Sequence, residues 1–167
     1  MSVYDHVVAA LNASGARYVV VGGIAVVLHG HARMTVDLDV VVDLAVEPAE
    51  AVISALADVG LRPRLPVEAM DFADPEVRGD WVDNRNLKVF SLYDPQDARR
   101  EVDLFASYPM PFEELVAGSV EMPFGDSTVR VASITHLIAL KRAAARPRDL
   151  EDIAALTALL ERTPNAD

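Results

Sequence analysis

The segment spanning residues 18–43, YVVVGGIAVVLHGHARMTVDLDVVVD, restricts the possible folds more than any other part of the chain. It begins with the run YVVV, which is typical of a short buried strand. Gly22 and Gly23 follow, and a glycine pair lets the backbone turn tightly and approach a ligand because no Cβ intervenes. The apolar residues 24–28 then predict a helix whose amino-terminal N–H groups and dipole face that turn. This order predicts an α/β fold in which a phosphate can bind at the glycine turn.

Two aspartates enter the next strand, at residues 38–42. Because side chains alternate along a strand, Asp37 and Asp39 share one face, while Leu38 and Val40 point into the core. Their Cα atoms would lie roughly 6–7 Å apart, so both carboxylates can converge on one or two hard cations, for which Mg²⁺ is the natural candidate. Without a cation the carboxylates would repel each other, and one would tend to stay protonated. The pair therefore predicts a divalent-metal site.

Each of these features also has a simpler interpretation. A glycine pair alone is more often only a tight strand-to-helix turn, and Asp37 and Asp39 can be surface carboxylates on an edge strand. The apolar runs on both sides of the aspartates favour instead a buried strand whose end opens on a cleft. His29 and His31 suggest zinc, but no third nitrogen or sulfur ligand stands at suitable spacing, and the carboxylates favour a harder ion.

The glycine pair, the apolar helix, the His-Gly dipeptide and the pattern R-x-T-x-D-x-D follow one another in a recognisable order. This order resembles the nucleotidyltransferase superfamily with the DNA polymerase β-like catalytic core, and the resemblance covers residues 19–42. It implies that the two glycines form the nucleotide-binding turn and that the two aspartates bind metal. It also implies that Arg33 and Thr35 lie beside the site and contact the nucleotide.

In that superfamily a later strand supplies a third carboxylate. Residues 100–105, REVDLF, place Asp103 in an alternating strand pattern. The resemblance therefore implies that Asp37, Asp39 and Asp103 are catalytic and hold two Mg²⁺ or Mn²⁺ ions. One ion would lower the pKa of an acceptor hydroxyl, with Asp103 as the base, and the other would stabilise the leaving pyrophosphate. The simpler interpretation of Asp103 is an aspartate that an edge strand exposes to water.

A second resemblance lies near the C-terminus, in residues 133–142 and 146–153. They are similar to the helical tail of small bacterial nucleotidyltransferases, including the toxin-like group. The resemblance implies that Lys141 offers a positive charge to phosphate oxygens and that Asp149 orients it. The densest positive cluster of the chain is also found here and consists of Lys141, Arg142, Arg146 and Arg148. It either flanks a cleft or is a solvated face with carboxylate partners.

Together the resemblances imply a metal-dependent nucleotidyltransferase. It would move a nucleoside monophosphate from an NTP, with ATP among the candidates, to a hydroxyl acceptor and release pyrophosphate. The acceptor stays open among a tRNA, a partner protein and a small hydroxylated molecule such as an aminoglycoside. The alternative is a non-catalytic binding or regulatory module with the same fold, as one half of a toxin–antitoxin pair. Three carboxylates favour the enzyme, because a module that only binds a partner has no physical need for them.

Composition sets further bounds. The 167 residues, 51% of them hydrophobic, are enough for one compact domain, and the formal net charge of −11 disfavours broad, non-specific binding to nucleic acid. The absence of cysteine excludes disulfides, thiolate zinc sites and a cysteine nucleophile. No basic region precedes an apolar core at the N-terminus, and no apolar run approaches the roughly 20 residues that span a bilayer. These observations predict a cytoplasmic protein without a membrane segment.

The remaining pattern predicts the following elements. Helices are expected at residues 2–13, 23–30, 47–59 and 111–117 and after Ser133, and strands at 17–21, 38–42, 86–92 and 101–105, with a hairpin around 124–127. Residues 62–86, which contain three prolines and many charges, are expected to form a long loop or lid with at most one short helix. The superfamily resemblance implies a mixed β-sheet flanked by helices, with a core at about 1–132 and a C-terminal helical pair at about 133–162, in a single domain.

Overall fold

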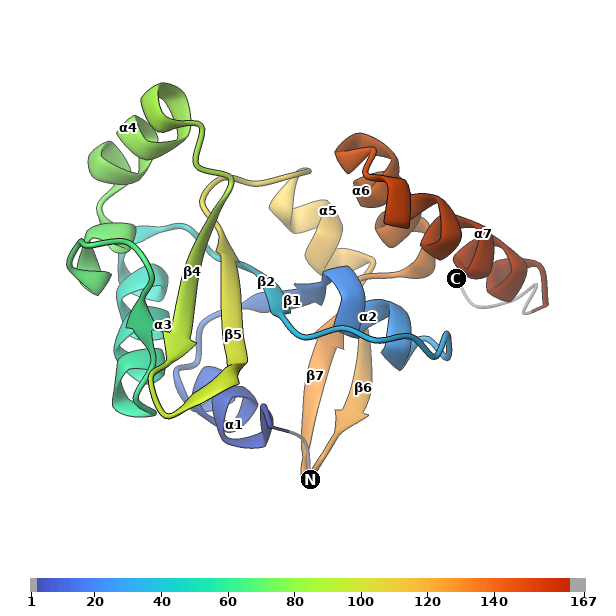
Figure 1. Ribbon diagram of the computed structural model, residues 1–167, viewed down its shortest axis with the longest axis horizontal. Coiled ribbons are helices and arrows are strands. Elements are labelled where there is room, and N and C mark those ends of the chain that lie inside the picture. Colours follow the sequence, from blue (N-terminus) through green and yellow to red (C-terminus); the bar gives the residue numbers. More distant parts are fainter. Residues whose placement is uncertain (1–2, 163–167) are drawn as a thin grey trace.

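The computed structural model describes residues 3–162 and has a mixed α/β architecture (Figure 1). The helices are α1 (Asp5–Ala13), α2 (Gly22–Leu28), α3 (Val46–Asp58), the 3₁₀ helix η1 (Ala69–Ala73), α4 (Pro75–Arg85), α5 (Phe112–Ala117), α6 (Ile134–Ala144) and α7 (Pro147–Arg162). The strands are β1 (Tyr18–Val21), β2 (Leu38–Val42), β3 (Arg62–Pro63), β4 (Val89–Asp94), β5 (Asp97–Phe105), β6 (Val120–Phe124) and β7 (Ser127–Val131). The predicted fold class is confirmed.

The strands of the described residues form one seven-stranded sheet in the order β3-β4-β5-β2-β1-β7-β6. The pairs β2–β5 and β1–β7 are parallel, and the other neighbours are antiparallel. Every residue of β1 and β2 except Asp39 is buried, as expected for central strands with both faces covered. In Figure 1, α3 and α4 lie to the left of β4 and β5, and α6 and α7, in red, lie on the opposite side beyond α2.

The register of the central strands determines which polar residues meet. Val21, the last residue of β1, pairs with Asp39 on β2, and Asp39 pairs in turn with Asp103 on β5. On the far side of β5, Ser91 of β4 pairs with Asp103. Residues from four strands therefore lie in one row across the sheet, directly next to the turn that begins at Gly22.

The segment 62–86 differs from its prediction as a long loop with at most one short helix. It forms β3, the 3₁₀ helix η1 and the 11-residue helix α4. Asp74 caps α4 through its side chain and Pro75 occupies the first turn, where its missing N–H costs nothing. Trp81 is buried and stacks on Phe90 with ring centroids 5.3 Å apart. The prolines of this segment predict a break in regular structure, whereas Pro75 begins a helix that packs on the sheet.

The C-terminal helical pair consists of α6 and α7. Ser133 precedes α6, and its Oγ accepts the N–H of His136 at 3.1 Å, as expected for an N-cap. Ala145 adopts the left-handed conformation with φ of 52°, which ends α6, and Pro147 opens α7. Within residues 3–162, none of the helices combines the length and apolar character needed to cross a bilayer.

Candidate active site

The segment that enters β2 alternates between a half-buried and an outward-facing side. Arg33, Thr35, Asp37 and Asp39 are partly buried, whereas the intervening Met34 is 92% exposed. The predicted alternation of the aspartate pair is therefore present, and it extends back to the arginine and threonine of the motif. All four side chains line one cavity of about 210 Å³.

Asp103 joins the two aspartates in this cavity. It pairs with Asp39 across the parallel β2–β5 ladder, and the hydroxyl of Ser91 donates a hydrogen bond to its Oδ1 at 2.5 Å. Ser91 was not singled out in the sequence, because only the β4–β5 register brings it beside Asp103. The Ser91 hydroxyl fixes one oxygen of the carboxylate and leaves the other for the cavity.

Two of the three carboxylates, those of Asp39 and Asp103, have raised pKa values. Burial, followed by the charges of Asp103 and Asp37, raises the pKa of Asp39 to about 6, although the N–H of Gly23 acts against the shift. Burial is also the main cause that raises the pKa of Asp103, opposed by the hydrogen bond from Ser91 and reinforced by the charge of Asp37. A cation would stabilise these buried carboxylates, because its positive charge offsets both the cost of their desolvation and their mutual repulsion.

The donor set fits a hard divalent ion in its chemistry, since it offers only carboxylate oxygens. Among residues 3–162, however, no three histidine, aspartate, glutamate or cysteine side chains are close enough together to hold an ion as they stand. The carboxylates share a cavity and repel one another, but they do not form a closed ligand cage. His29, one of the two histidines behind the zinc interpretation, has its Nε2 2.8 Å from the carbonyl oxygen of Ala132.

The glycine pair is required because the aspartate strand packs directly against it. Gly22 has φ of +66°, and a Cβ there would lie 1.9 Å from Oδ2 of Asp39. A Cβ on Gly23 would lie 2.2 Å from the Thr35 hydroxyl and 2.8 Å from a terminal nitrogen of Arg33. The N–H of Gly23 donates a hydrogen bond to the carboxylate of Asp39. The sequence instead predicts that the N–H groups at this turn are free to donate to a phosphate.

Gly22→Ala is expected to lower the free energy of unfolding by about 2–4 kcal/mol, because it combines left-handed strain with overpacking against Asp39. Gly15 provides a matched control, since its φ is +72° but no atom lies within 4 Å of the point that an added Cβ would occupy. Gly15→Ala should therefore cost only about 1 kcal/mol. Urea unfolding of both variants measures the difference, and equal losses would show that Asp39 does not crowd Gly22.

A buried ionic network joins the C-terminal helices to the segment that enters β2, through Arg33. Lys141 is only 4% exposed, and its Nζ lies 2.6 Å from Oδ2 of Asp152 and 3.6 Å from Oδ1 of Asp149. Asp152 in turn lies 3.0 Å from Nε of Arg33, and Arg146 donates to Asp149 at 3.1 Å. Asp149 contacts Lys141 as predicted, but Asp152, which was missed, is the nearer partner. The pattern R-D-x-x-D at residues 148–152 could have indicated this partner, because residues three apart lie on the same face of a helix.

The two arginines that flank Pro147 complete the polar cavity. Arg146 and Arg148 both line it, together with Lys141 and the three aspartates. Arg148 forms no ion pair with any residue in the described range 3–162, so its charge is available to a ligand. Arg142, the fourth member of the predicted positive cluster, is exposed and does not line the cavity.

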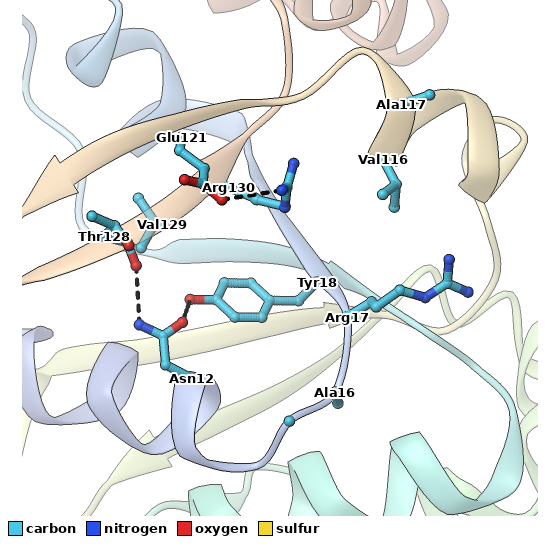
Figure 2. A pocket seen from close by; sticks show the side chains of 11 residues that line it. Asn12, Ala16, Arg17, Tyr18, Val116, Ala117, Glu121, Thr128, Val129 and Arg130 are labelled. Carbon is cyan, nitrogen blue, oxygen red and sulfur yellow. Dashed lines mark hydrogen bonds and ion pairs between the residues drawn. The ribbon is translucent and has the colours of Figure 1, made fainter.

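A larger cavity, of about 620 Å³, lies away from these residues between α1, α5 and the β6–β7 hairpin (Figure 2). Its polar groups satisfy one another: Tyr18 donates to Asn12 at 2.6 Å, and Arg130 pairs with Glu121 at 3.1 Å. It contains one carboxylate, that of Glu121, and this is already paired. The smaller cavity, which is lined by both carboxylates and cationic side chains, is the better candidate for chemistry.

The chain matches the family model described as "Nucleotidyl transferase AbiEii toxin, Type IV TA system" over residues 7–166. Its fold is similar to that of the lincosamide antibiotic adenylyltransferase LnuA in a lincomycin-bound crystal structure, with a TM-score of 0.61 and 15% identity over 92% of this chain and 93% of that one. It is also similar to the antibiotic-resistance factor ANT(2'')-Ia in solution, with a TM-score of 0.61 and 14% identity over 93% of this chain and 80% of that one. A search of curated proteins gave no significant match. At these identities the structural likeness shows the fold alone.

Proposed function

The chain belongs to the AbiEii nucleotidyl transferase toxin family of type IV toxin–antitoxin systems, and we propose that it transfers a nucleoside monophosphate from an NTP to a hydroxyl acceptor in the cavity around Asp39. The observation that carries the proposal is the convergence of opposite charges in that cavity. Asp37, Asp39 and Asp103 line this cavity together with the cationic side chains of Arg146 and Arg148. A triphosphate needs this combination, because its own charges require cations and its reacting phosphorus requires an oriented nucleophile.

Divalent ions, Mg²⁺ or Mn²⁺, would be held by Asp37, Asp39 and Asp103. The support is the elevated pKa of Asp39, about 6, and the oxygen-only donor set. When bound, divalent ions neutralise charge on the phosphates and lower the pKa of the acceptor hydroxyl. Since the three carboxylates do not form a closed cage, we propose that the nucleotide phosphates complete the coordination, as is usual for Mg²⁺.

The chain's own side chains would then divide the reaction between them. The acceptor oxygen forms a bond to the α-phosphorus, the bond to the β-phosphate oxygen breaks, and pyrophosphate leaves. The proton of the acceptor passes to Oδ2 of Asp103, whose Oδ1 is held by Ser91. Arg146 and Arg148 bind the phosphate oxygens on the leaving side. Lys141, buried between two aspartates, contributes mainly by fixing α6 and α7 against the catalytic segment.

Arg148→Gln is expected to weaken NTP affinity about threefold to tenfold, the modest loss typical of an exposed charge. Arg142→Gln is the matched control, because Arg142 is also exposed and close in sequence but does not line the cavity. Calorimetric titration of a Mg²⁺–NTP complex into each variant measures the affinities. Equal affinities in the two variants would remove Arg148 from the phosphate site.

The transfer itself is tested with the four α-³²P-labelled NTPs, Mg²⁺ or Mn²⁺, and three acceptor pools: total RNA, total protein and a small-molecule extract. We propose that label appears in one pool and that an equivalent amount of pyrophosphate is released. The pool that is labelled identifies the acceptor class and thereby the target through which a toxin would act. A folded protein that binds nucleotide but labels none of the pools would contradict the transferase proposal and support a non-catalytic module.

A further inference from the structure

Tyr4 lies outside every motif of the sequence, yet its hydroxyl lies at the point where the carboxylate strands begin. The side chain is only 3% exposed. Its hydroxyl bonds to the carbonyl oxygen of Val36 and lies 2.8 Å from the carbonyl oxygen of Glu101, whose N–H donates back to it at 3.1 Å. The backbone of Leu38 also bonds to the phenol oxygen. One phenol therefore touches the peptide groups on both sides of Asp37.

This position matters because the β-ladder does not reach Asp37. The parallel β2–β5 pairing starts at Leu38 and Val102, so the backbone immediately before it has no partner strand. The Tyr4 hydroxyl bridges the two chain segments at that point, from Val36 on one side to Glu101 on the other. It takes the place of the next ladder bond and sets how far Asp37 lies from the strand that carries Asp103.

The segment that Tyr4 holds is tied to the C-terminal helices by the ion pair of Arg33 with Asp152, whereas Tyr4 ties it to β5. Residues 31–37 have no regular secondary structure, and the side chains of Met34 and Val36 are 92% and 52% exposed. Tyr4 itself is anchored, since Arg100 of β5 donates to the carbonyl oxygen of the preceding Val3 at 3.0 Å. The N-terminal turn and β5 thus form a fixed base, and the Tyr4 hydroxyl connects the irregular entry to β2 with that base.

We propose that Tyr4 is a positioning residue that fixes Asp37 relative to Asp103 through the peptide groups of Val36 and Leu38. The catalytic part of this inference rests on the proposed nucleotide transfer. Catalytic geometry is sensitive to displacements of about 1 Å, which can cost about a hundredfold in rate. Loss of one hydroxyl hydrogen bond should therefore affect turnover more strongly than it affects nucleotide binding, which also depends on the cationic residues of the cavity.

The test compares Tyr4→Phe with Tyr18→Phe. Tyr18 is a matched control, because it is 6% exposed and its hydroxyl also makes a hydrogen bond, to Asn12 in the larger cavity (Figure 2). Both variants keep the ring, so both should fold with similar thermal stability. Tyr4→Phe should accelerate hydrogen exchange of a peptide covering residues 34–40 about tenfold and lower kcat about tenfold, with KM for the NTP changed less than about threefold. Tyr18→Phe should leave all three values at the wild-type level.

The two readouts separate this inference from the proposed function. If the wild type transfers no nucleotide, the proposed function fails, and the exchange comparison still decides whether Tyr4 holds the segment. Equal exchange in the two variants would overturn the proposal. Faster exchange in Tyr4→Phe with an unchanged kcat in an active enzyme would also overturn it, because Tyr4 would then stabilise the segment without positioning the reaction.

Discussion

Asp39→Asn is expected to reduce nucleotide transfer about a thousandfold or more. Asp39 is the central carboxylate of the cavity, because it lies between Gly22 on one side and Asp103 on the other. Neutralising it removes a ligand for divalent ions, whose charge stabilisation is worth several kcal/mol in the transition state. The measurement is release of labelled pyrophosphate under single-turnover conditions. Residual activity within tenfold of the wild type would exclude Asp39 from the metal site.

The same substitution is expected to stabilise the protein when no divalent ion is present. The pKa of Asp39 is raised from 3.8 to about 6, so the folded state takes up a proton more readily than the unfolded state. The stability associated with that proton is fully present below about pH 4 and is lost as the pH rises through about 6. Asparagine imitates the protonated form, and Asp39→Asn should therefore gain about 2–3 kcal/mol at pH 7 and almost nothing at pH 4.

Urea unfolding in EDTA at the two pH values measures this gain. Asp126→Asn is the control, because Asp126 is exposed on the β6–β7 turn and should change neither stability nor activity. A loss of stability at pH 7 in Asp39→Asn would show that the carboxylate is a structural ion-pair partner. A gain of stability together with a loss of activity would mark Asp39 as a residue retained for function at the expense of stability.

Lys141→Met is expected to destabilise the protein by about 3–5 kcal/mol, because it leaves the carboxylates of Asp149 and Asp152 buried without their shared cation. Lys88, the chain's other lysine, is exposed on the segment before β4, so Lys88→Met should cost less than about 0.5 kcal/mol. Chemical unfolding of both variants gives the comparison.

The double variant Lys141→Met/Asp152→Asn tests the cause of that loss. Neutralising one carboxylate should restore part of the stability, since Lys141→Met leaves two buried carboxylates with only Arg33 and Arg146 as cationic partners. If the double variant is no more stable than Lys141→Met alone, the lysine acts through packing of its aliphatic stem. If Lys141→Met itself behaves like Lys88→Met, the buried network does not hold the helices.

The features that were predictable from the sequence are those that depend on local order. Strand alternation alone placed Asp37 and Asp39 on one face, and the glycine pair, the cap at Ser133 and the break at Pro147 are each set by residues within a few positions. Asp103 was found through a resemblance, and its place beside Asp39 follows from the β2–β5 register. Such local features can be predicted because the residues that indicate them are the same residues that form them.

The features that were missed depend on residues distant in the sequence. Ser91 reaches Asp103 only through strand pairing, and Tyr4 reaches Val36 only because α1 starts beside β5. The prolines and charges of segment 62–86 predict a loop, whereas in the structure Asp74 caps α4 and Trp81 stacks on Phe90 of the sheet. The conformational preferences of individual residues do not predict these contacts, because the contacts arise from tertiary packing.

A metal–nucleotide site at the cavity aspartates is tested most directly by calorimetric titration of each Mg²⁺–NTP complex into the wild type and into Asp39→Asn. We predict that at least one nucleotide binds the wild type with an affinity that disappears when Mg²⁺ is replaced by EDTA. Asp39→Asn, folded and at least as stable, should bind that nucleotide at least tenfold more weakly. Equal binding in the two proteins, or no binding by the folded wild type, would contradict a metal–nucleotide site formed by the aspartates of this cavity.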